Sequence, residues 1–309
     1  MVWMFGMPVA GVLMGAYWAY RVAFYAPPRD GEEILALPPG QQYAVHREQL
    51  IECFLDLNSH PWEPVTIVGP DGKKLFGRYF PVRKGAPVQI QFHGYRGCAI
   101  RDMCGVAPLA MKMGYNVLLV DQRSHGRSEG NTITFGIRER QDLQCWCRYA
   151  ARRFGPKTPL VLYGVSMGAA TVLMAADMPL PKSVKAIIAD CPYSSPSAII
   201  GRVAKQMGLP QKPSVAVCHL AAVLYGHFRL ESASPVKAVR NTRLPILLLH
   251  GAADDFVPCE MSRQIYAACN GDRQLAIFPK AAHGMSFLQD PPRYEATVSA
   301  FLKKHLSNS

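Results

Sequence analysis

The sequence lacks any run of basic residues, although its formal charge at pH 7 is +12. The Lys and Arg residues are spread thinly over 309 positions, and no nucleic-acid-binding module is recognisable. A nucleic acid is therefore not expected as a partner. A basic surface is also attracted to anionic lipid head groups. A membrane is therefore a second explanation for the positive charge, which is relevant because the amino-terminal segment is apolar.

Regularly spaced cysteines are missing as well. The nine cysteines are an odd number and do not follow the spacing of a small disulfide scaffold. Cys145 and Cys147 are too close together for a zinc knuckle, and no second Cys or His pair lies nearby. We expect reduced, mostly buried thiols, with neither a metal nor a cofactor.

Charged residues are absent from positions 2 to 20. In a helix this stretch is about 28 Å long, close to the thickness of the bilayer hydrocarbon. Trp3 near one end and Trp18 near the other suit the two membrane interfaces. No basic residue precedes the stretch and no clear cleavage site follows it, which disfavours a cleaved signal peptide. The sequence predicts an uncleaved transmembrane anchor over residues 1–26.

A buried or surface-docked helix is the alternative for this stretch, because its glycines and proline weaken a helix in water. The orientation depends on Arg21 and Arg29, which follow the apolar run while no basic residue precedes it. This asymmetry favours a single-pass membrane protein with a cytoplasmic catalytic domain.

The rest of the chain divides into a linker and one folded domain. Proline pairs break regular structure in residues 27–62, with some helix expected around 41–55. The domain then occupies 63–309 and opens with two strand-like runs that flank a Gly-Pro-Asp-Gly turn, which predicts a hairpin.

Strand-like and helix-like segments alternate through the domain. The expected strands are 88–92, 117–120, 160–163, 184–189, 245–249 and 274–278, and the expected helices are 103–113, 136–154, one from 167, one from 260 and 292–305. This pattern predicts an α/β fold with a mostly parallel sheet covered on both faces. Residues 192–242 interrupt the alternation without an obvious strand, and we expect them to form a helical cap.

Ser166 lies in the motif Gly164-Val-Ser-Met-Gly168, between an apolar run and a helix-like stretch. A sharp turn between a strand and a helix exposes a serine hydroxyl at the top of a sheet, where it can act as a nucleophile. The motif is short, and chance or a purely structural turn also produces it. Ser166 is therefore a candidate nucleophile that needs partners.

Partners follow two later strands. The run ending at Leu249 leads into a loop with Asp254 and Asp255, and the run ending at Phe278 leads into a loop with His283. Functional groups of an open α/β sheet gather at the carboxyl ends of its strands. A serine needs a base, and the base needs an acid that fixes its tautomer.

With these motifs, residues 63–305 resemble the α/β-hydrolase superfamily, most closely the membrane-anchored bacterial serine hydrolases of the prolyl-aminopeptidase and monoacylglycerol-lipase-like branch. The resemblance rests on the Gly-x-Ser-Met-Gly-Ala-Ala, His-Gly-x-x-Asp-x-x-Val-Pro and Ala-His-Gly sequences. It implies that Asp254 is the acid and Asp255 a bystander. It also implies that the oxyanion hole uses the backbone amides of Tyr95 and Met167. An alternative role for the Tyr95 side chain is to line the acyl pocket.

Other histidines fit the base less well than His283. The resemblance implies structural roles for His93 and His125, and the position of His250 at a strand end favours packing. The cap is apolar, which favours an apolar substrate, although the same side chains could simply pack the cap onto the sheet.

The expected function is hydrolysis of a carboxylic ester or thioester, through Ser166, His283 and Asp254, with a small-molecule or lipid-like ester as substrate. One alternative is a peptidase or amidase of the same fold, which the single carboxylate of the cap, Glu231, disfavours. The other is a catalytically silent, membrane-tethered binding protein.

Overall fold

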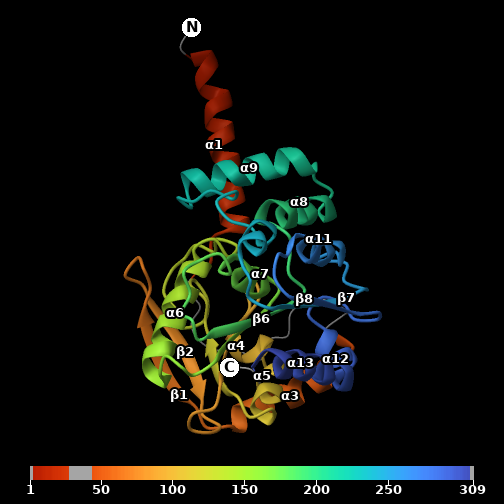
Figure 1. The fold of residues 1–309 in the computed structure, drawn as a ribbon. Coiled ribbons are helices and arrows are strands. Elements are labelled where there is room, and N and C mark those ends of the chain that lie inside the picture. The colour runs from red at the N-terminus through yellow and green to blue at the C-terminus, as the bar shows by residue number, and fades with distance from the viewer. Residues whose placement is uncertain (1–2, 28–43, 307–309) are drawn as a thin grey trace.

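The computed structural model describes residues 3–27 and 44–306 of the chain (Figure 1). The part of the predicted linker from 28 to 43, including Arg29, lies outside the described residues. The helix expected around 41–55 is present as α3 (Arg47–Ser59).

Within the described residues, one sheet has the strand order β1-β2-β4-β3-β5-β6-β7-β8. The pairs β1/β2 and β2/β4 are antiparallel and all later pairs are parallel, as the alternating pattern predicted. The strands are β1 (Glu63–Val68), β2 (Lys74–Phe80), β3 (Val88–Phe92), β4 (Asn116–Val120), β5 (Leu160–Val165), β6 (Val184–Asp190), β7 (Ile246–Gly251) and β8 (Arg273–Phe278).

The register of the strands places the candidate loops at one edge of the sheet. In the predicted hairpin Val68 pairs with Lys74, so the turn is tight. In the parallel part, Phe92 at the end of β3 pairs with Gly164 of β5, and Gly251 at the end of β7 pairs with Phe278 of β8. The loops that follow these strands therefore meet on the same side.

Helices cover both faces of the sheet (Figure 1). One apolar cluster packs α6 (Glu139–Phe154), α7 (Met167–Met174) and α11 (Glu260–Ala268) against one face. The other face carries α3, α4 (Ala99–Asp102), α5 (Val106–Lys112) and α13 (Pro291–Leu306), with the short α12 (Ser286–Gln289) beside α13. The strands β4 and β7 are buried along their whole length and β5 nearly so, which is why these central strands appear in the sequence as continuous apolar runs.

The helix predicted over 103–113 is present as α5, but it begins only at Val106, and the separate short helix α4 before it was not predicted. The break between the two helices includes Gly105. A side chain at Gly105 would overlap the ring of Phe287, so the chain needs a glycine there, and glycine weakens a helix. Pro108 then lies in the first turn of α5, where a missing amide proton is tolerated.

The interval 192–242 forms the expected helical cap. It contains α8 (Pro196–Gln206), α9 (Gln211–Leu224), α10 (Pro235–Ala238) and the 3₁₀ turn η2 (Val239–Asn241). Serine side chains at Ser195 and Ser234 cap the N-termini of α8 and α10, each just before a proline. Ile199, Ala221 and Phe228 of the cap pack into an apolar cluster with Met167 of α7.

Helix α1 (Trp3–Ala23) packs against the cap and crosses α9, while its N-terminal half extends beyond the body of the protein (Figure 1). Ala16, Ala19, Tyr20 and Phe24 are buried in the same cluster as the cap. For this part of the chain the structure shows a helix docked on the protein.

Across residues 3–27 and 44–306, no helix combines the length and the mean hydropathy that crossing a membrane requires. The prediction of a transmembrane helix is therefore not supported. In α1 the glycines at 6, 11 and 15, Pro8 and the aromatic residues of the last turns lower the mean hydropathy of an otherwise apolar segment.

Candidate active site

Ser166 stands at a strained turn between β5 and α7. Its backbone has φ +54°, a left-handed conformation that non-glycine residues adopt only when the surroundings enforce it. A Cβ at Gly168 would overlap the carbonyl of Phe92, and one at Gly164 would overlap the backbone of Gly168. The two glycines of the motif are thus required by close packing of α7 on β3 and β5.

His283, in the loop after β8, bonds to the serine. Its Nε2 lies 2.9 Å from the Ser166 Oγ, and its Nδ1 lies 2.7 Å from Oδ2 of Asp254. Because the Asp254 oxygen is an acceptor, Nδ1 carries the proton and Nε2 is left to accept from the serine hydroxyl. The structure therefore brings three separate loops into one chain of hydrogen bonds.

Asp254 is held rigidly by its own loop. Its Oδ1 accepts from the amides of Phe256 and Val257, at 3.0 and 2.8 Å. Burial by itself raises the pKa of this carboxyl, but hydrogen bonds from His250 and His283 outweigh it and lower the pKa to about 2. The neighbouring Asp255 is exposed, so the structure places Asp254 and not Asp255 against the histidine.

His250 has a more specific position than the packing role that its sequence context favours. This fully buried ring places Nε2 at 2.9 Å from the Val257 carbonyl and 3.2 Å from Oδ2 of Asp254. Its Nδ1 lies 2.6 Å from the Ser262 hydroxyl. Both groups near Nε2 are acceptors, so Nε2 donates and Nδ1 accepts. His250 thereby orients the carboxylate that orients His283.

Asp190, at the end of β6, is a buried carboxyl that no sequence motif singles out. It accepts from the hydroxyls of Tyr294, at 3.0 Å, and Ser286, at 3.3 Å. Burial is the largest influence and raises its pKa to about 6, although these hydrogen bonds oppose the rise. Its backbone carbonyl accepts from the amide of Ser166 at 2.8 Å. Asp190 thus links Ser286 of α12 and Tyr294 of α13 to the turn that carries Ser166.

The loop after β3 carries Tyr95, and α7 begins at Met167, whose amide is one of the groups a helix start leaves unpaired. Neither of these two amides donates to an acceptor within the described part of the chain. Asp102 braces the loop, because its Oδ2 accepts from the Gly94 amide at 3.1 Å and fills the space beside Gly97. Asp102 was not singled out from the sequence, which offers no motif for it.

His93 and His125 are engaged in backbone hydrogen bonds. Nδ1 of His93 donates to the Gly94 carbonyl and its Nε2 accepts from the Gln122 amide. Burial lowers the pKa of His93, so the ring is neutral. In the same way His125 bonds to the carbonyl of Arg123 and the amide of Arg96. These contacts leave neither ring facing the serine.

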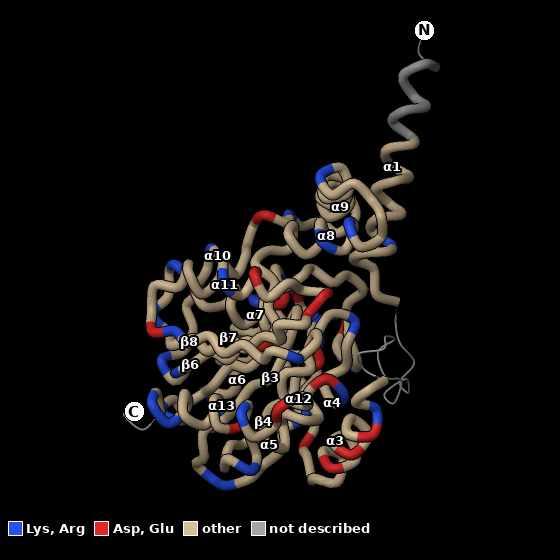
Figure 2. The backbone as a smooth tube through the Cα atoms, turned by 90° about the vertical axis from the view of Figure 1, so that its right-hand side faces the viewer, with Lys and Arg blue, Asp and Glu red and all other residues tan. Residues whose placement is uncertain are grey.

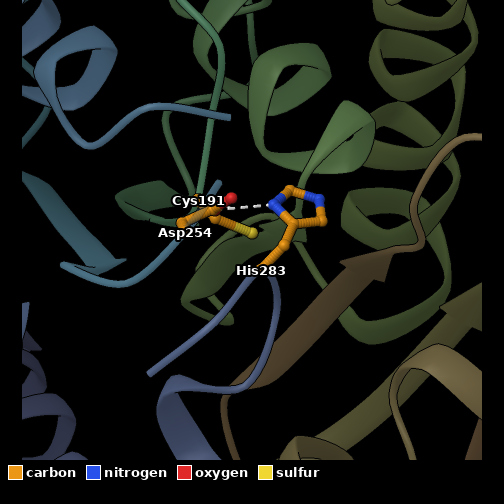
Figure 3. A group of neighbouring side chains, drawn as sticks. All are labelled: Cys191, Asp254 and His283. Carbon is orange, nitrogen blue, oxygen red and sulfur yellow. Dashed lines mark hydrogen bonds and ion pairs between the residues drawn. The ribbon is translucent and has the colours of Figure 1, made fainter. Parts of the chain in front are cut away.

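Cys191 follows β6 and lies beside Asp254 and His283 (Figure 3). Possible ligand atoms of the three residues are within 4.8 Å of one another, a mixture of types that zinc accepts. The 2.7 Å separation of Asp254 Oδ2 and His283 Nδ1 is shorter than the spacing of two ligands around one zinc ion. Burial raises the pKa of the Cys191 thiol well above its usual value. Asp254 and His283 therefore fit a hydrogen-bonded triad with Ser166, and the arrangement of Cys191, Asp254 and His283 does not fit a zinc centre.

A separate surface groove of about 650 Å³ lies on the far side of the sheet, between α3, α5 and α13. None of its lining residues belongs to the serine turn, the Asp254 loop or the His283 loop. Aromatic and apolar side chains of the body and the cap surround the catalytic residues instead. The ring of Phe256 lies 5.1 Å from that of His283, and Tyr193 and Phe135 belong to the apolar cluster that contains Met167.

This arrangement can transfer an acyl group. His283 can take the proton of Ser166 as the serine attacks a carbonyl, and Asp254 stabilises the imidazolium that forms. The amides of Tyr95 and Met167, which have no acceptor among residues 3–27 and 44–306, can donate hydrogen bonds to the oxyanion of a tetrahedral intermediate.

Comparison with known proteins identifies a hydrolase family and a similar fold. The sequence profile described as the prolyl oligopeptidase family matches residues 106–309. The uncharacterized protein YqkD of Bacillus subtilis is 29% identical over 195 residues, and the match covers 63% of this chain but 64% of YqkD, just under two thirds of that protein. The uncharacterized protein YfhR of Escherichia coli K12 is 26% identical over 235 residues, covering 72% of this chain and 74% of YfhR.

Among solved structures, a crystal form of the Pyrococcus furiosus esterase Pf2001 is similar, with a TM-score of 0.65 and 26% identity. That likeness covers 81% of this chain and 95% of the esterase chain. A match over this share of both chains shows that the α/β-hydrolase fold extends over most of the protein.

Proposed function

The chain belongs to the prolyl oligopeptidase family, and from that membership we propose that it is a serine hydrolase that cleaves carboxylic esters or thioesters. The observation that carries this proposal is the unbroken chain of hydrogen bonds from Asp254 through His283 to Ser166, at 2.7 and 2.9 Å. A binding protein that merely kept the fold would have no use for a serine in a strained backbone conformation at the end of that chain.

The proposed reaction proceeds through an acyl-enzyme. Ser166 attacks the carbonyl carbon while Nε2 of His283 accepts the serine proton, and the amides of Tyr95 and Met167 stabilise the oxyanion. His283 then donates that proton to the departing alcohol or thiol. Water, deprotonated by His283, attacks the acyl-enzyme and releases the acid and free Ser166. Loss of one oxyanion donor typically costs about 3 kcal/mol of transition-state stabilisation, so the two loops matter as much as the serine.

An ester is favoured over a peptide by the charge of the cap. A peptidase that selects a free amino terminus needs a carboxylate to bind the ammonium group. Glu231 is the single carboxylate in residues 192–242, and its side chain already pairs with His219 at 2.9 Å. The apolar cluster shared by the cap, α1 and α7 suits an acyl chain instead.

Turnover on a matched panel tests this choice. The panel contains p-nitrophenyl esters of short and long acids together with amino-acid p-nitroanilides, which share a chromophore-bearing leaving group of similar size. We expect a higher kcat/KM for the esters, increasing with acyl length. A higher kcat/KM for the anilides would assign the protein to the peptidases of the family.

We also propose that the protein works at an anionic membrane surface, with α1 lying in the interface. The face of α1 opposite the cap is apolar and exposed, with Met14 71% and Trp18 62% accessible. Exposing an apolar helix face to water is unfavourable in free energy. Trp and Tyr side chains are readily accommodated at the interface between a membrane and water. Met207 and Leu209 are also exposed and lie in the connection between α8 and α9. These two helices are at the same end of the molecule as α1 (Figure 1).

The charge of the cap complements anionic lipids. Figure 2 shows Lys and Arg positions on and around α8 and α9. Against Glu231, residues 192–242 contain the basic residues Arg202, Lys205, Lys212, Arg229, Lys237 and Arg240. Each basic residue near an anionic leaflet contributes about 1 kcal/mol of attraction. A catalytic domain on the cytoplasmic side, where such lipids are found, stays a prediction.

Vesicle flotation tests the membrane proposal. The full-length protein is expected to float with vesicles that contain phosphatidylserine and to bind phosphatidylcholine vesicles more weakly. Trp18→Ala is expected to reduce flotation, whereas Trp62→Ala, which removes an exposed tryptophan beside Arg78, is not. Equal flotation of both variants, or none of the wild type, would contradict the proposal.

A further inference from the structure

The end of α1 touches the loop that carries the oxyanion amide. The guanidinium Nη2 of Arg96 donates to the carbonyls of Val22, at 2.7 Å, and Tyr25, at 3.1 Å. The hydroxyl of Tyr95 donates to the carbonyl of Ala23 at 2.9 Å. Helices leave their last carbonyls without a partner, and a positive charge at that end is favourable. Two adjacent residues of the oxyanion loop thus cap a helix more than 70 positions earlier in the chain.

A second set of contacts reinforces this connection. The Tyr95 ring stacks on Phe135 with centroids 5.1 Å apart, and Phe135 in turn meets the edge of Phe24 at 5.7 Å. Phe24 accepts a backbone hydrogen bond from Ile133, and Tyr25 forms an isolated bridge with Thr132. The segment 131–135 therefore contacts both the end of α1 and the oxyanion loop.

The backbone of Arg96 is itself constrained. Its φ is +51°, and its amide donates to Nε2 of His125 at 3.0 Å. An arginine in this conformation keeps it only while surrounding contacts enforce it. With the amide of Arg96 fixed by His125 and its side chain fixed by α1, the peptide unit between Tyr95 and Arg96 has little freedom to move. It is joined through the Cα of Tyr95 to the Gly94–Tyr95 peptide unit, which carries the Tyr95 amide, so the position of that amide is restricted in turn.

We infer that Arg96 is a positioning residue, which ties the C-terminal end of α1 to the oxyanion loop so that the docking of α1 sets the rate of catalysis. The inference rests on the proposed serine hydrolase function and adds to it a role for the N-terminal helix. Arg96 acts through the Tyr95 amide, so its loss affects the transition state, where the oxyanion forms, more than the binding of the ground-state ester.

Three variants of the full-length protein test this role. Arg96→Ala removes both hydrogen bonds to α1, and Arg96→Lys keeps the charge and can retain one. Tyr95→Phe removes the hydroxyl, with its bond to Ala23 and its interaction with Arg96, while preserving the ring. Arg138→Ala is the matched control, because the Arg138 side chain also donates to a backbone carbonyl, that of His227 in the cap, and among the described residues it forms no hydrogen bond with α1 or the oxyanion loop.

We expect kcat on p-nitrophenyl esters to decrease about tenfold in Arg96→Ala with KM nearly unchanged, a fraction of what losing a whole oxyanion donor costs. Arg96→Lys is expected to recover part of the loss, Tyr95→Phe to show a smaller decrease, and Arg138→Ala to match the wild type. Affinity for an alkyl boronate, which mimics the tetrahedral intermediate, is expected to weaken in proportion to kcat.

A purely structural role predicts a different result. In that case Arg96→Ala has a lower melting temperature, but each active site that a fluorophosphonate titrates retains the wild-type kcat and boronate affinity, and this overturns the inference. If Arg96→Ala does not fold, Tyr95→Phe decides by the same two measurements.

Failure of the proposed function gives a separate signature. A wild-type protein that hydrolyses no ester contradicts the proposed substrate class, yet the rate at which fluorophosphonate modifies Ser166 still reports the oxyanion hole. That rate is expected to decrease in Arg96→Ala relative to Arg138→Ala. Equal rates in those two variants overturn the role of Arg96 whatever the substrate is.

Discussion

Asp254 and His283 are joined by a 2.7 Å hydrogen bond between Oδ2 and Nδ1, which fixes the tautomer that leaves Nε2 facing Ser166. The bond explains why two adjacent aspartates with the same chemistry have different roles. The Asp254 carboxylate is buried and accepts hydrogen bonds from two backbone amides. The neighbouring Asp255 is exposed, and its backbone carbonyl accepts from Arg202 and Gln206.

A pair of amide substitutions at these aspartates separates their roles. Asp254→Asn is expected to reduce kcat by about 10⁴, because an asparagine stabilises the wrong tautomer of the histidine. Asp255→Asn is the control and is expected to stay within twofold of the wild type. Steady-state kinetics on one ester check both, and a larger loss in Asp255→Asn would reverse the assignment of the acid.

The low pKa of Asp254, about 2, also predicts a pH dependence. Its folded pKa is below the unfolded value, so its contribution to stability is present above about pH 4 and is lost as the pH falls toward 2. The stability advantage of the wild type over Asp254→Asn is therefore expected to shrink as the pH falls from 4 to 2, measured by urea unfolding. An advantage that stays constant over this interval would contradict the low pKa of the carboxyl.

His250→Ala tests the support of the acid. The substitution removes a donor from Asp254 and leaves the buried Ser262 hydroxyl and Val257 carbonyl without their partner. We expect a loss of about 1–3 kcal/mol in the free energy of unfolding, together with a decrease in kcat. Denaturant unfolding and kinetics measure the two effects. A destabilised variant with unchanged kcat would mean that His250 packs the loop without orienting Asp254.

Asp190 predicts the opposite pH dependence to Asp254. Burial raises its folded pKa to about 6, so stability is highest where Asp190 is neutral and decreases as the pH rises from about 4 through 6. Asp190→Asn removes this titration. The free energy of unfolding of the variant relative to the wild type is expected to increase by about 1 kcal/mol between pH 5 and 7.5. A relative stability that is constant or decreases over this interval contradicts the buried charge.

Gly168→Ala tests the close packing of the serine turn. Its new Cβ overlaps the Phe92 carbonyl, so α7 must move away from β3, and Ser166 moves with it. We expect a lower melting temperature and strongly reduced activity. Gly15→Ala is the matched control, because nothing lies within 4 Å of the added Cβ and alanine favours a helix. Equal behaviour of the two variants would show that the turn tolerates a side chain.

The sheet was predictable because its central strands are buried on both faces, so that runs such as 160–163 and 246–249 are almost uninterrupted apolar sequence. The loops of Ser166, Asp254 and His283 were predictable because each follows such a run directly. His250 and Asp190 were not predictable in their roles, since the groups they bond, Ser262 and Tyr294, depend on how α11 and α13 pack.

The N-terminal segment shows the limit of composition as a guide. An uncharged stretch of suitable length predicted a transmembrane helix, but its glycines and aromatic residues lower the mean hydropathy below what a span requires. The contacts of Val22 and Ala23 with Arg96 and Tyr95 were also beyond reach, because nothing in either segment specifies a partner more than 70 positions away.

Trapping the acyl-enzyme tests the central claim most directly. Full-length protein is mixed with excess p-nitrophenyl ester and quenched in acid within the first turnover, and peptide mass mapping locates the acyl group. We expect a burst of p-nitrophenol equal to the enzyme concentration and an acyl group on Ser166, and we expect both to be lost in Ser166→Ala. Turnover that persists in Ser166→Ala, or an acyl group carried by a different residue, would contradict the claim.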